Sequence, residues 1–186
     1  MAKFFDEIND QLRTFIESQK IFFVATAGEE GRINLSPKGY DSLRVLGPNR
    51  LLWINLSGSG NETAAHLLAV NRITLMFCSF DDKPLILRVY GSAKAYHPRD
   101  PEWSSLSNEF ESFPGMRQII DVTVDSAQTS CGWGVPLLEF SGEREKLVQH
   151  NAAKSPEAIQ KGWVEKNAFS IDGLPTGIDE ATDRSE

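Results

Sequence analysis

The sequence predicts a mainly β protein with flanking helices, folded as a closed or split antiparallel barrel. Short apolar runs rich in β-branched and aromatic residues follow one another at short intervals, and one helical pattern interrupts the first six of them. A doubly wound sheet would alternate strands with helices, so this order excludes that fold. The expected strands cover residues 21–26, 32–36, 43–46, 51–55, 73–78, 85–96 and 119–128.

The chain opens with a helical pattern. Apolar residues recur at helical spacing from Phe5 to Ile16, with charged and polar residues between them, which predicts an amphipathic helix over residues 4–18. Its apolar stripe must cover either an end of the barrel or a second subunit. The next two strands are joined by a glycine-containing hairpin loop at residues 27–31.

The second strand ends in Ser36, Pro37 and Lys38. Because Pro37 has no N–H, we expect strand pairing to be interrupted there. Lys38 is a basic group at a strand end, although most lysines are simply solvated. In the long strand at 85–96, Gly91 is expected to form a bulge or a bend.

Further helices are expected on either side of the last strand. Trp103, Leu106 and Phe110 mark one face of a helix over residues 101–110, and weaker patterns follow at 143–150 and 156–167. We therefore divide the chain into a barrel domain, residues 1–141, and a helical C-terminal extension, residues 142–186. The extension ends in a polar, acidic tail that is expected to fray.

A glycine- and serine-rich loop after the strand at 51–55 is the first candidate binding element. It occupies residues 57–60 and leads into a helix whose start is marked by Asn61 and Thr63, both of which are N-cap residue types. The first N–H groups of a helix are unpaired and carry partial positive charge, which suits a phosphate. The alternative is a turn that merely joins strand to helix.

Bulk properties limit the function classes. The 186 residues carry a net charge of -7, which gives no electrostatic support to nucleic-acid binding, and no apolar run is long enough to span a membrane. The start of the chain lacks the apolar core of a signal peptide. Cys78 and Cys131 are expected to be buried, reduced thiols. The missing signal peptide and the reduced thiols together predict a cytoplasmic protein.

No catalytic motif is visible, and the catalytic residues are unknown at this stage. Nucleophile–base, zinc-protease and Walker motifs are absent from the sequence, and cysteine and histidine never cluster, so no metal site is expected. The three histidines are expected to be structural or surface residues. Trp133, between two glycines, could stack on a flat ring or could anchor a core.

Five segments stand out by their order and spacing, and these are Val24–Thr26, Asn34–Gly39, Ser57–Ala64, Asn71–Phe77 and Tyr90–Ala93. No single segment is specific alone. Together they resemble the pyridoxamine 5′-phosphate oxidase-like, FMN-binding split-barrel family, and the resemblance spans residues 4–140.

This resemblance implies a six-stranded antiparallel split barrel and a homodimer that holds FMN in grooves between its subunits. The strand end of the second strand would lie near the cofactor phosphate and ribityl chain, the loop and helix start would bind the same phosphate, and Trp133, from the same or the partner subunit, would lie near the ring. Glu62 would contribute its backbone N–H, because its carboxylate repels phosphate. The implied cofactor-binding residues are Ser36, Pro37, Lys38, Leu56, Ser57, Asn61, Glu62, Thr63 and Trp133.

The C-terminal region departs from the true oxidase. It has no arginine-rich segment and ends in an acidic tail. We therefore carry over the fold and the cofactor, not the substrate. The leading hypothesis is an FMN-dependent oxidoreductase with an unknown small-molecule substrate and electron donor. The alternatives are a flavin-binding or flavin-sensing protein without turnover, and a deazaflavin or haem binder on the same fold.

Overall fold

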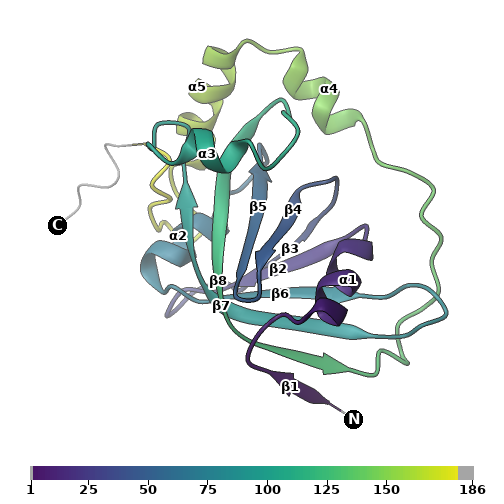
Figure 1. Cartoon of the computed structure of the whole chain (residues 1–186). Coiled ribbons are helices and arrows are strands. Elements are labelled where there is room, and N and C mark those ends of the chain that lie inside the picture. The colour runs from purple at the N-terminus through teal and green to yellow at the C-terminus, as the bar shows by residue number, and fades with distance from the viewer. Residues whose placement is uncertain (1, 180–186) are drawn as a thin grey trace.

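The structure, a computed structural model, describes residues 2–179. One antiparallel sheet of eight strands forms its centre, in the order β3-β2-β6-β7-β8-β5-β4, with β1 pairing with β8 (Figure 1). Its path ends on β3 and β4, so the sheet does not close. The predicted split-barrel class is confirmed, with eight strands rather than six. The strands are β1 (Lys3–Phe5), β2 (Phe22–Thr26), β3 (Asn34–Lys38), β4 (Leu43–Gly47), β5 (Arg50–Leu56), β6 (Ile73–Cys78), β7 (Ile86–Tyr96) and β8 (Met116–Ser130).

Five helices flank the sheet in the described part of the chain. Four of them lie near their predicted positions, but α3 is shorter than expected. They are α1 (Asp10–Ser18), α2 (Glu62–Ala69), α3 (Trp103–Ser107), α4 (Lys146–Ala152) and α5 (Pro156–Asn167). No helix among residues 2–179 is long and apolar enough to cross a bilayer.

The predicted helix at residues 4–18 is wrong in its first part. Residues 3–5 form β1, paired with residues 127–129 of β8, and the helix begins only after Asn9. The Asn9 side chain accepts a hydrogen bond from the N–H of Leu12 at 2.9 Å, so it caps α1 and fixes this start. The apolar face of α1 packs on the inside of the barrel through Leu12 and Ile16, and Ile8, just before the helix, joins the same cluster.

Two local predictions about the strands have opposite outcomes. Pro37 does not interrupt pairing: it lies opposite Phe23 within β3, because β3 is an edge strand on which a missing N–H can face away from the neighbour. The bulge at Gly91 is confirmed by a register shift between Tyr90 and Gly91. A Cβ at Gly91 would overlap the carbonyl oxygen of Thr123, which explains why glycine stands there.

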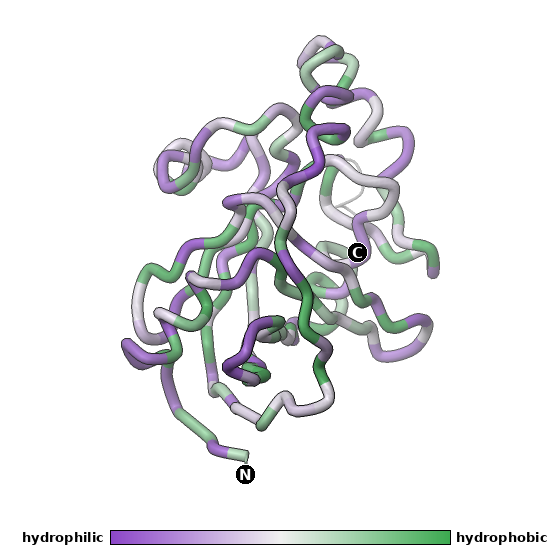
Figure 2. Tube along the Cα trace, turned by 90° about the vertical axis from the view of Figure 1, so that its right-hand side faces the viewer, coloured by the Kyte–Doolittle hydropathy of each residue, from purple (hydrophilic) through white to green (hydrophobic). Residues whose placement is uncertain are grey.

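The core follows the alternation of the strands. In β7 every second residue from Leu87 to Ala93 is buried, and Figure 2 shows the corresponding alternation of apolar and polar residues along the strands. The main apolar cluster fills the barrel around Trp53, Leu75 and Phe77, and a smaller one lies beneath α3. Cys78 is buried, but Cys131 is exposed, which corrects the prediction of two buried thiols.

A long segment without helix or strand, residues 131–145, connects β8 to α4. It runs along the outside of the barrel to the two C-terminal helices, which lie at the far end of the molecule (Figure 1). We call it the strap. Its backbone is anchored where the N–H of Leu138 donates to the carbonyl of Phe80 and where the Tyr40 hydroxyl donates to the carbonyl of Arg144. Most of the predicted acidic tail, residues 180–186, lies outside the described residues.

Candidate functional site

One face of the edge strand β3 carries three polar side chains. Asn34, Ser36 and Lys38 alternate along it, as the period of two requires. The Asn34 amide donates to the hydroxyl of Thr63, in the first turn of α2, at 3.1 Å. At the other end, the Lys38 ammonium lies 5.0 Å from the ring centroid of Trp53 on β5. The beginning of β3 therefore adjoins the start of α2, whereas its end at Lys38 lies against β5.

Lys38, which is partly buried, lies close to a fully buried cation, Arg117, at the start of β8. Arg117 is 2% exposed and donates to Asn167 Oδ1 at 2.8 Å and to the carbonyl of Gly60 at 3.0 Å. Burial, aided by the positive charge of Arg117, lowers the pKa of Lys38 to about 8. Burial alone lowers the pKa of Arg117 to about 10.

Within the part of the chain that the structure describes, no ion pair balances the charge of Lys38 and Arg117. Among residues 2–179, no carboxylate forms an ion pair with Lys38 or Arg117. Buried cations are normally paired, since an isolated buried charge is strongly disfavoured. The arrangement is therefore suited to an anion that the protein does not supply itself.

Unpartnered donors surround the two cations. The Asn55 amide donates to Gln118 Oε1 at 2.9 Å and to Asn61 Oδ1 at 3.3 Å, which ties three polar side chains into one network. Several buried atoms of this region meet no partner in the described structure, although buried polar atoms are normally satisfied. They are Ser36 Oγ, Trp53 Nε1, Asn61 Nδ2, Arg117 Nε and Gln118 Nε2. We call Ser36, Lys38, Trp53, Asn55, Asn61, Arg117 and Gln118 the polar cluster.

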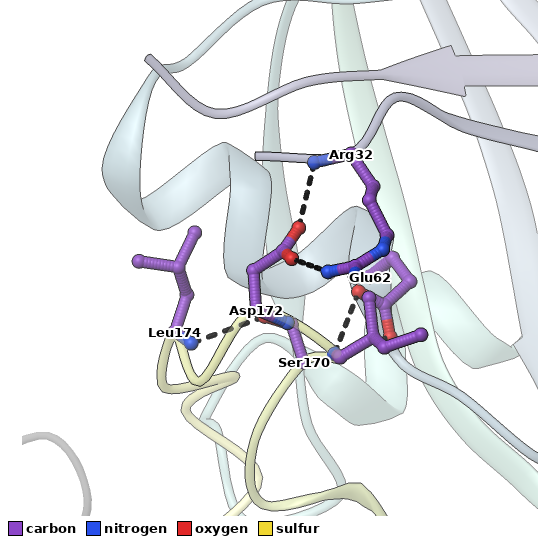
Figure 3. A network of polar contacts seen from close by, with 6 residues as sticks. Arg32, Glu62, Ser170, Asp172 and Leu174 are labelled. Atoms are coloured by element: carbon purple, nitrogen blue, oxygen red, sulfur yellow. Dashed lines mark hydrogen bonds and ion pairs between the residues drawn. The ribbon is translucent and has the colours of Figure 1, made fainter. Parts of the chain in front are cut away.

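The start of α2 contributes to this region through Asn61 and Thr63. The Asn61 side chain does not cap the helix but faces Asn55. Glu62 behaves differently, because both of its carboxylate oxygens accept from the N–H of Ile171, at 3.1 and 3.2 Å (Figure 3). The acidic group that would repel a phosphate is thus engaged by the C-terminal turn.

The same turn is fastened to the β2–β3 hairpin. Asp172 accepts from the backbone N–H of Arg32 at 2.7 Å and forms an ion pair with its guanidinium (Figure 3). The hydrogen bond from the Arg32 N–H, together with the guanidinium, lowers the pKa of the Asp172 carboxyl. The C-terminal residues therefore cover the beginning of α2 on its outer side.

The glycine–serine loop is covered by α5. The Ser57 hydroxyl donates to the carbonyl of Gly115 at 3.0 Å and accepts from Trp163 Nε1 at 2.7 Å, and the Asn167 amide donates to the carbonyl of Gly58 at 3.3 Å. Ser57 is thus bonded within the chain, and a cofactor role for it stays a prediction. Leu56, the last residue of β5, is half-buried against the cluster beneath α3.

Trp133 lies on the strap and is 83% exposed, so the core-anchor alternative is wrong. None of the interactions of the polar cluster involves it, and its role near a cofactor ring also stays a prediction. Within residues 2–179, no cluster of histidine, cysteine and carboxylate side chains could hold a metal ion.

The sequence reasoning missed the residues that complete the polar cluster, namely Trp53, Asn55, Arg117 and Gln118. The sequence does contain a signal for Arg117 and Gln118, because these two polar residues stand directly before the apolar pair Ile119–Ile120 of a strand. The β8 strand pairs Asn55 with Gln118 but Leu56 with Met116, so Arg117 is the extra residue of a bulge. Bulges re-aim side chains, which is how Arg117 comes to face Gly60 and Asn167.

Comparison with known proteins identifies the family. The sequence model of the family described as pyridoxamine 5′-phosphate oxidase matches residues 8–131. The pyridoxamine 5′-phosphate oxidase family protein ustO of Aspergillus flavus is 34% identical over 197 residues, covering 94% of this chain and 78% of that protein. The chain belongs to the pyridoxamine 5′-phosphate oxidase family.

Solved structures agree with this fold. A variant of HupZ from Group A Streptococcus matches with a TM-score of 0.55 at 17% identity, over 66% of this chain and 99% of that one. A Lactobacillus delbrueckii protein named as a candidate pyridoxamine 5′-phosphate oxidase matches with a TM-score of 0.53 at 16% identity, over 66% and 93%. At such identities the likeness shows the fold.

Proposed function

We propose that this family member binds FMN at the polar cluster and acts as an FMN-dependent oxidoreductase on a small molecule. The observation that carries the proposal is the pair of a partly buried Lys38 and a buried Arg117, which lie among unpartnered donors and form no ion pair with a carboxylate of residues 2–179. The phosphate of FMN supplies the missing negative charge. Its ribityl hydroxyls and the carbonyl oxygens of its ring supply acceptors for the donors.

The residues divide into roles by chemistry. Lys38 and Arg117 would neutralise the phosphate, with Ser36 and the first N–H groups of α2 beside them. Asn61 and Gln118 would donate to neutral oxygens of the cofactor, and Trp53 has an indole N–H for the same purpose. We keep the other cofactor-binding residues that the family resemblance implies, and expect them to line the remainder of the FMN molecule. They are Pro37, Leu56, Ser57, Glu62, Thr63 and Trp133.

Bound FMN would supply the redox chemistry by accepting and passing on a hydride or electrons. The chain's part is to hold the cofactor, to bury its charged end and to leave the ring accessible to a substrate. The described site offers no general base, so the proposal assigns no proton transfer to a side chain.

The test is the absorption spectrum of the purified chain, followed by titration of the ligand-free protein with FMN. We expect a yellow protein with flavin bands, and saturable binding of FMN when the cofactor has been removed. A colourless protein that also fails to bind added FMN would refute the proposal. Mass spectrometry of the released ligand separates FMN from a deazaflavin or haem.

Turnover is tested separately. Rapid mixing of the FMN-loaded protein with NADH and NADPH measures reduction of the flavin, and a range of other donors follows. Reduction at a useful rate supports an oxidoreductase. Absence of reduction by every donor favours the alternative, a protein that binds or senses flavin without turnover.

We also propose that two copies of the chain associate. Apolar side chains are exposed on the strap and on the neighbouring edge strand β3, where a monomer would leave them in water. They are Trp133, Leu137, Leu138 and Phe140 on the strap, and Ile33 and Leu35 on or beside β3. Sedimentation velocity should give a dimer, and a stable monomer that retains FMN would contradict an interface that completes the site.

A further inference from the structure

Two adjoining cavities lie where the C-terminal helices meet the barrel. The first, an open cavity of about 430 Å³, lies between the glycine–serine loop on one side and α4, α5 and their connection on the other. Its titratable lining side chains are His150, Lys154 and Lys166, all of them basic. Among the described residues that line it, none is an aspartate or a glutamate. The chain as a whole carries a net charge of -7, so the local excess of basic groups runs against the composition.

Two of the three basic groups of the first cavity, both of them exposed, lie close to each other. The Lys154 ammonium is 2.7 Å from His150 Nε2, and within residues 2–179 neither group forms an ion pair with a carboxylate. An anion placed beside Lys154 and His150 would stabilise the charged forms of both side chains, because an opposite charge within a few ångströms favours ionisation. The loop that forms the opposite wall adds small residues, which allow a ligand to approach closely.

The second cavity also combines apolar walls with basic residues, which are His97, Arg99 and Lys154. It has a volume of about 510 Å³ and is lined largely by apolar side chains, including Phe113, Met116 and Val164. It shares part of its wall with the first cavity, and the shared residues are Asn151, Lys154, Ile159 and Trp163. Lys154 therefore borders both spaces. Ligand sites in proteins have volumes of roughly 300–1,000 Å³ and combine an apolar lining with a few polar groups, which describes this pair.

We propose that the two cavities form one binding site for an organic acid with an apolar body. The acid group lies in the basic cavity near Lys154 and Lys166, and the apolar body lies in the second cavity. This site is distinct from the polar cluster, because the side chain of Asn167 stands between them: its Oδ1 accepts from Arg117 while the residue lines the basic cavity. The two sites adjoin, because Ser57, which belongs to the proposed cofactor set, also lines the basic cavity.

The experiment is calorimetric titration of the full chain with 2-naphthoate and with its neutral counterpart 2-naphthamide. We expect the anion to bind at least tenfold more tightly than the amide, and added NaCl to weaken binding of the anion alone, because salt screens exposed charges. The double variant Lys154→Gln, Lys166→Gln should lose roughly tenfold in naphthoate affinity, as expected for two partly exposed contacts. The matched control Lys146→Gln changes an exposed lysine on α4 that lines neither cavity and should leave the affinity unchanged.

Equal affinities for the anion and the amide, absence of binding of both, or equal losses in the double variant and the control would each overturn the proposal. The salt dependence of the unaltered protein decides the matter even where the double variant fails to fold. Titration of protein with and without bound FMN keeps this outcome separate from the proposed flavin function. Naphthoate that binds both forms supports a second site, and naphthoate displaced by FMN contradicts one.

Discussion

Replacement of Lys38 by methionine should stabilise the ligand-free protein while weakening its binding of FMN. Methionine keeps an unbranched apolar side chain against Trp53 but removes the charge. The pKa of Lys38 falls from 10.5 to about 8 on folding, because the ammonium is buried beside Arg117. That difference corresponds to about 3 kcal/mol of destabilisation of the charged, ligand-free folded state. The variant should recover a part of it.

The pH dependence gives the signature of this effect. Below about pH 8 Lys38 is charged in both the folded and unfolded states, so the destabilisation is fully present at pH 7. Between about 8 and 10.5 the unfolded chain binds the proton and the folded chain does not, so the stability of the natural protein rises with pH. The advantage of Lys38→Met should therefore be largest at pH 7 and disappear by about pH 10.5.

Urea unfolding of ligand-free protein at several pH values measures the first effect, and titration with FMN measures the second. We expect the variant to lose about 1.5–3 kcal/mol of FMN binding, or roughly 10- to 150-fold, as for one buried charge-assisted contact. Lys83→Met, at an exposed position in the turn between β6 and β7, is the control and should change neither quantity. A variant that is less stable at pH 7 and binds FMN as before would refute the assignment of Lys38 to an anion site.

Three further predictions concern the scaffold. Asn167→Leu removes the side chain that accepts from Arg117 and donates to the carbonyl of Gly58. Urea unfolding should therefore show a free energy of unfolding lowered by about 1–3 kcal/mol, and titration should show weaker FMN binding. A variant as stable as the natural protein would argue against the docked position of α5. Gly91→Ala places a methyl group against the carbonyl of Thr123, and urea unfolding should show a loss of at least ~2 kcal/mol, whereas Gly134→Ala, which has open space around it, should be close to neutral. Asp172 has a lowered pKa in the folded state, so its tie to Arg32 is present above the ordinary value of 3.8 and is lost as the pH falls through the lower folded value. Asp172→Asn should therefore raise hydrogen exchange at residues 170–174 at neutral pH, and unchanged exchange would show that the ion pair does not hold the turn.

The sequence predicts those elements whose signal is local. The strands from β2 to β8 are found because apolar residues alternate or cluster within each of them, and α2 is found because N-cap residue types follow a glycine-rich loop. The strand β1 is missed because its three residues gain their conformation from pairing with residues 127–129, far along the chain. A helical spacing that runs from Phe5 to Ile16 cannot reveal that distant partner.

The residues of the candidate site also divide into those with a local sequence signal and those placed by contacts between distant parts of the chain. Ser36, Lys38, Asn61 and Thr63 are predictable, since strand ends and helix starts carry recognisable residue types. Arg117 is not, because its position depends on a bulge in the pairing of β8 with β5. The docking of α5 is equally hidden, since the contact of Trp163 with Ser57 joins residues 106 positions apart in sequence and leaves no periodic pattern.

The placement of the two cations makes the stability of the folded chain depend on its ligand. The charge on Lys38 disfavours the ligand-free state by about 3 kcal/mol, and a ligand present at a hundred times its dissociation constant stabilises the folded state by about 2.7 kcal/mol. The two quantities are of the same size, so a bound phosphate can offset the destabilisation that its own site creates. Arg117 would strengthen this dependence, because its contacts with Asn167 and Gly60 would link the proposed anion to α5 and to the glycine–serine loop. Loss of the anion should therefore loosen the docking of α5 as well as lower the stability of the barrel, and hydrogen exchange at residues 156–167 should rise when FMN is removed.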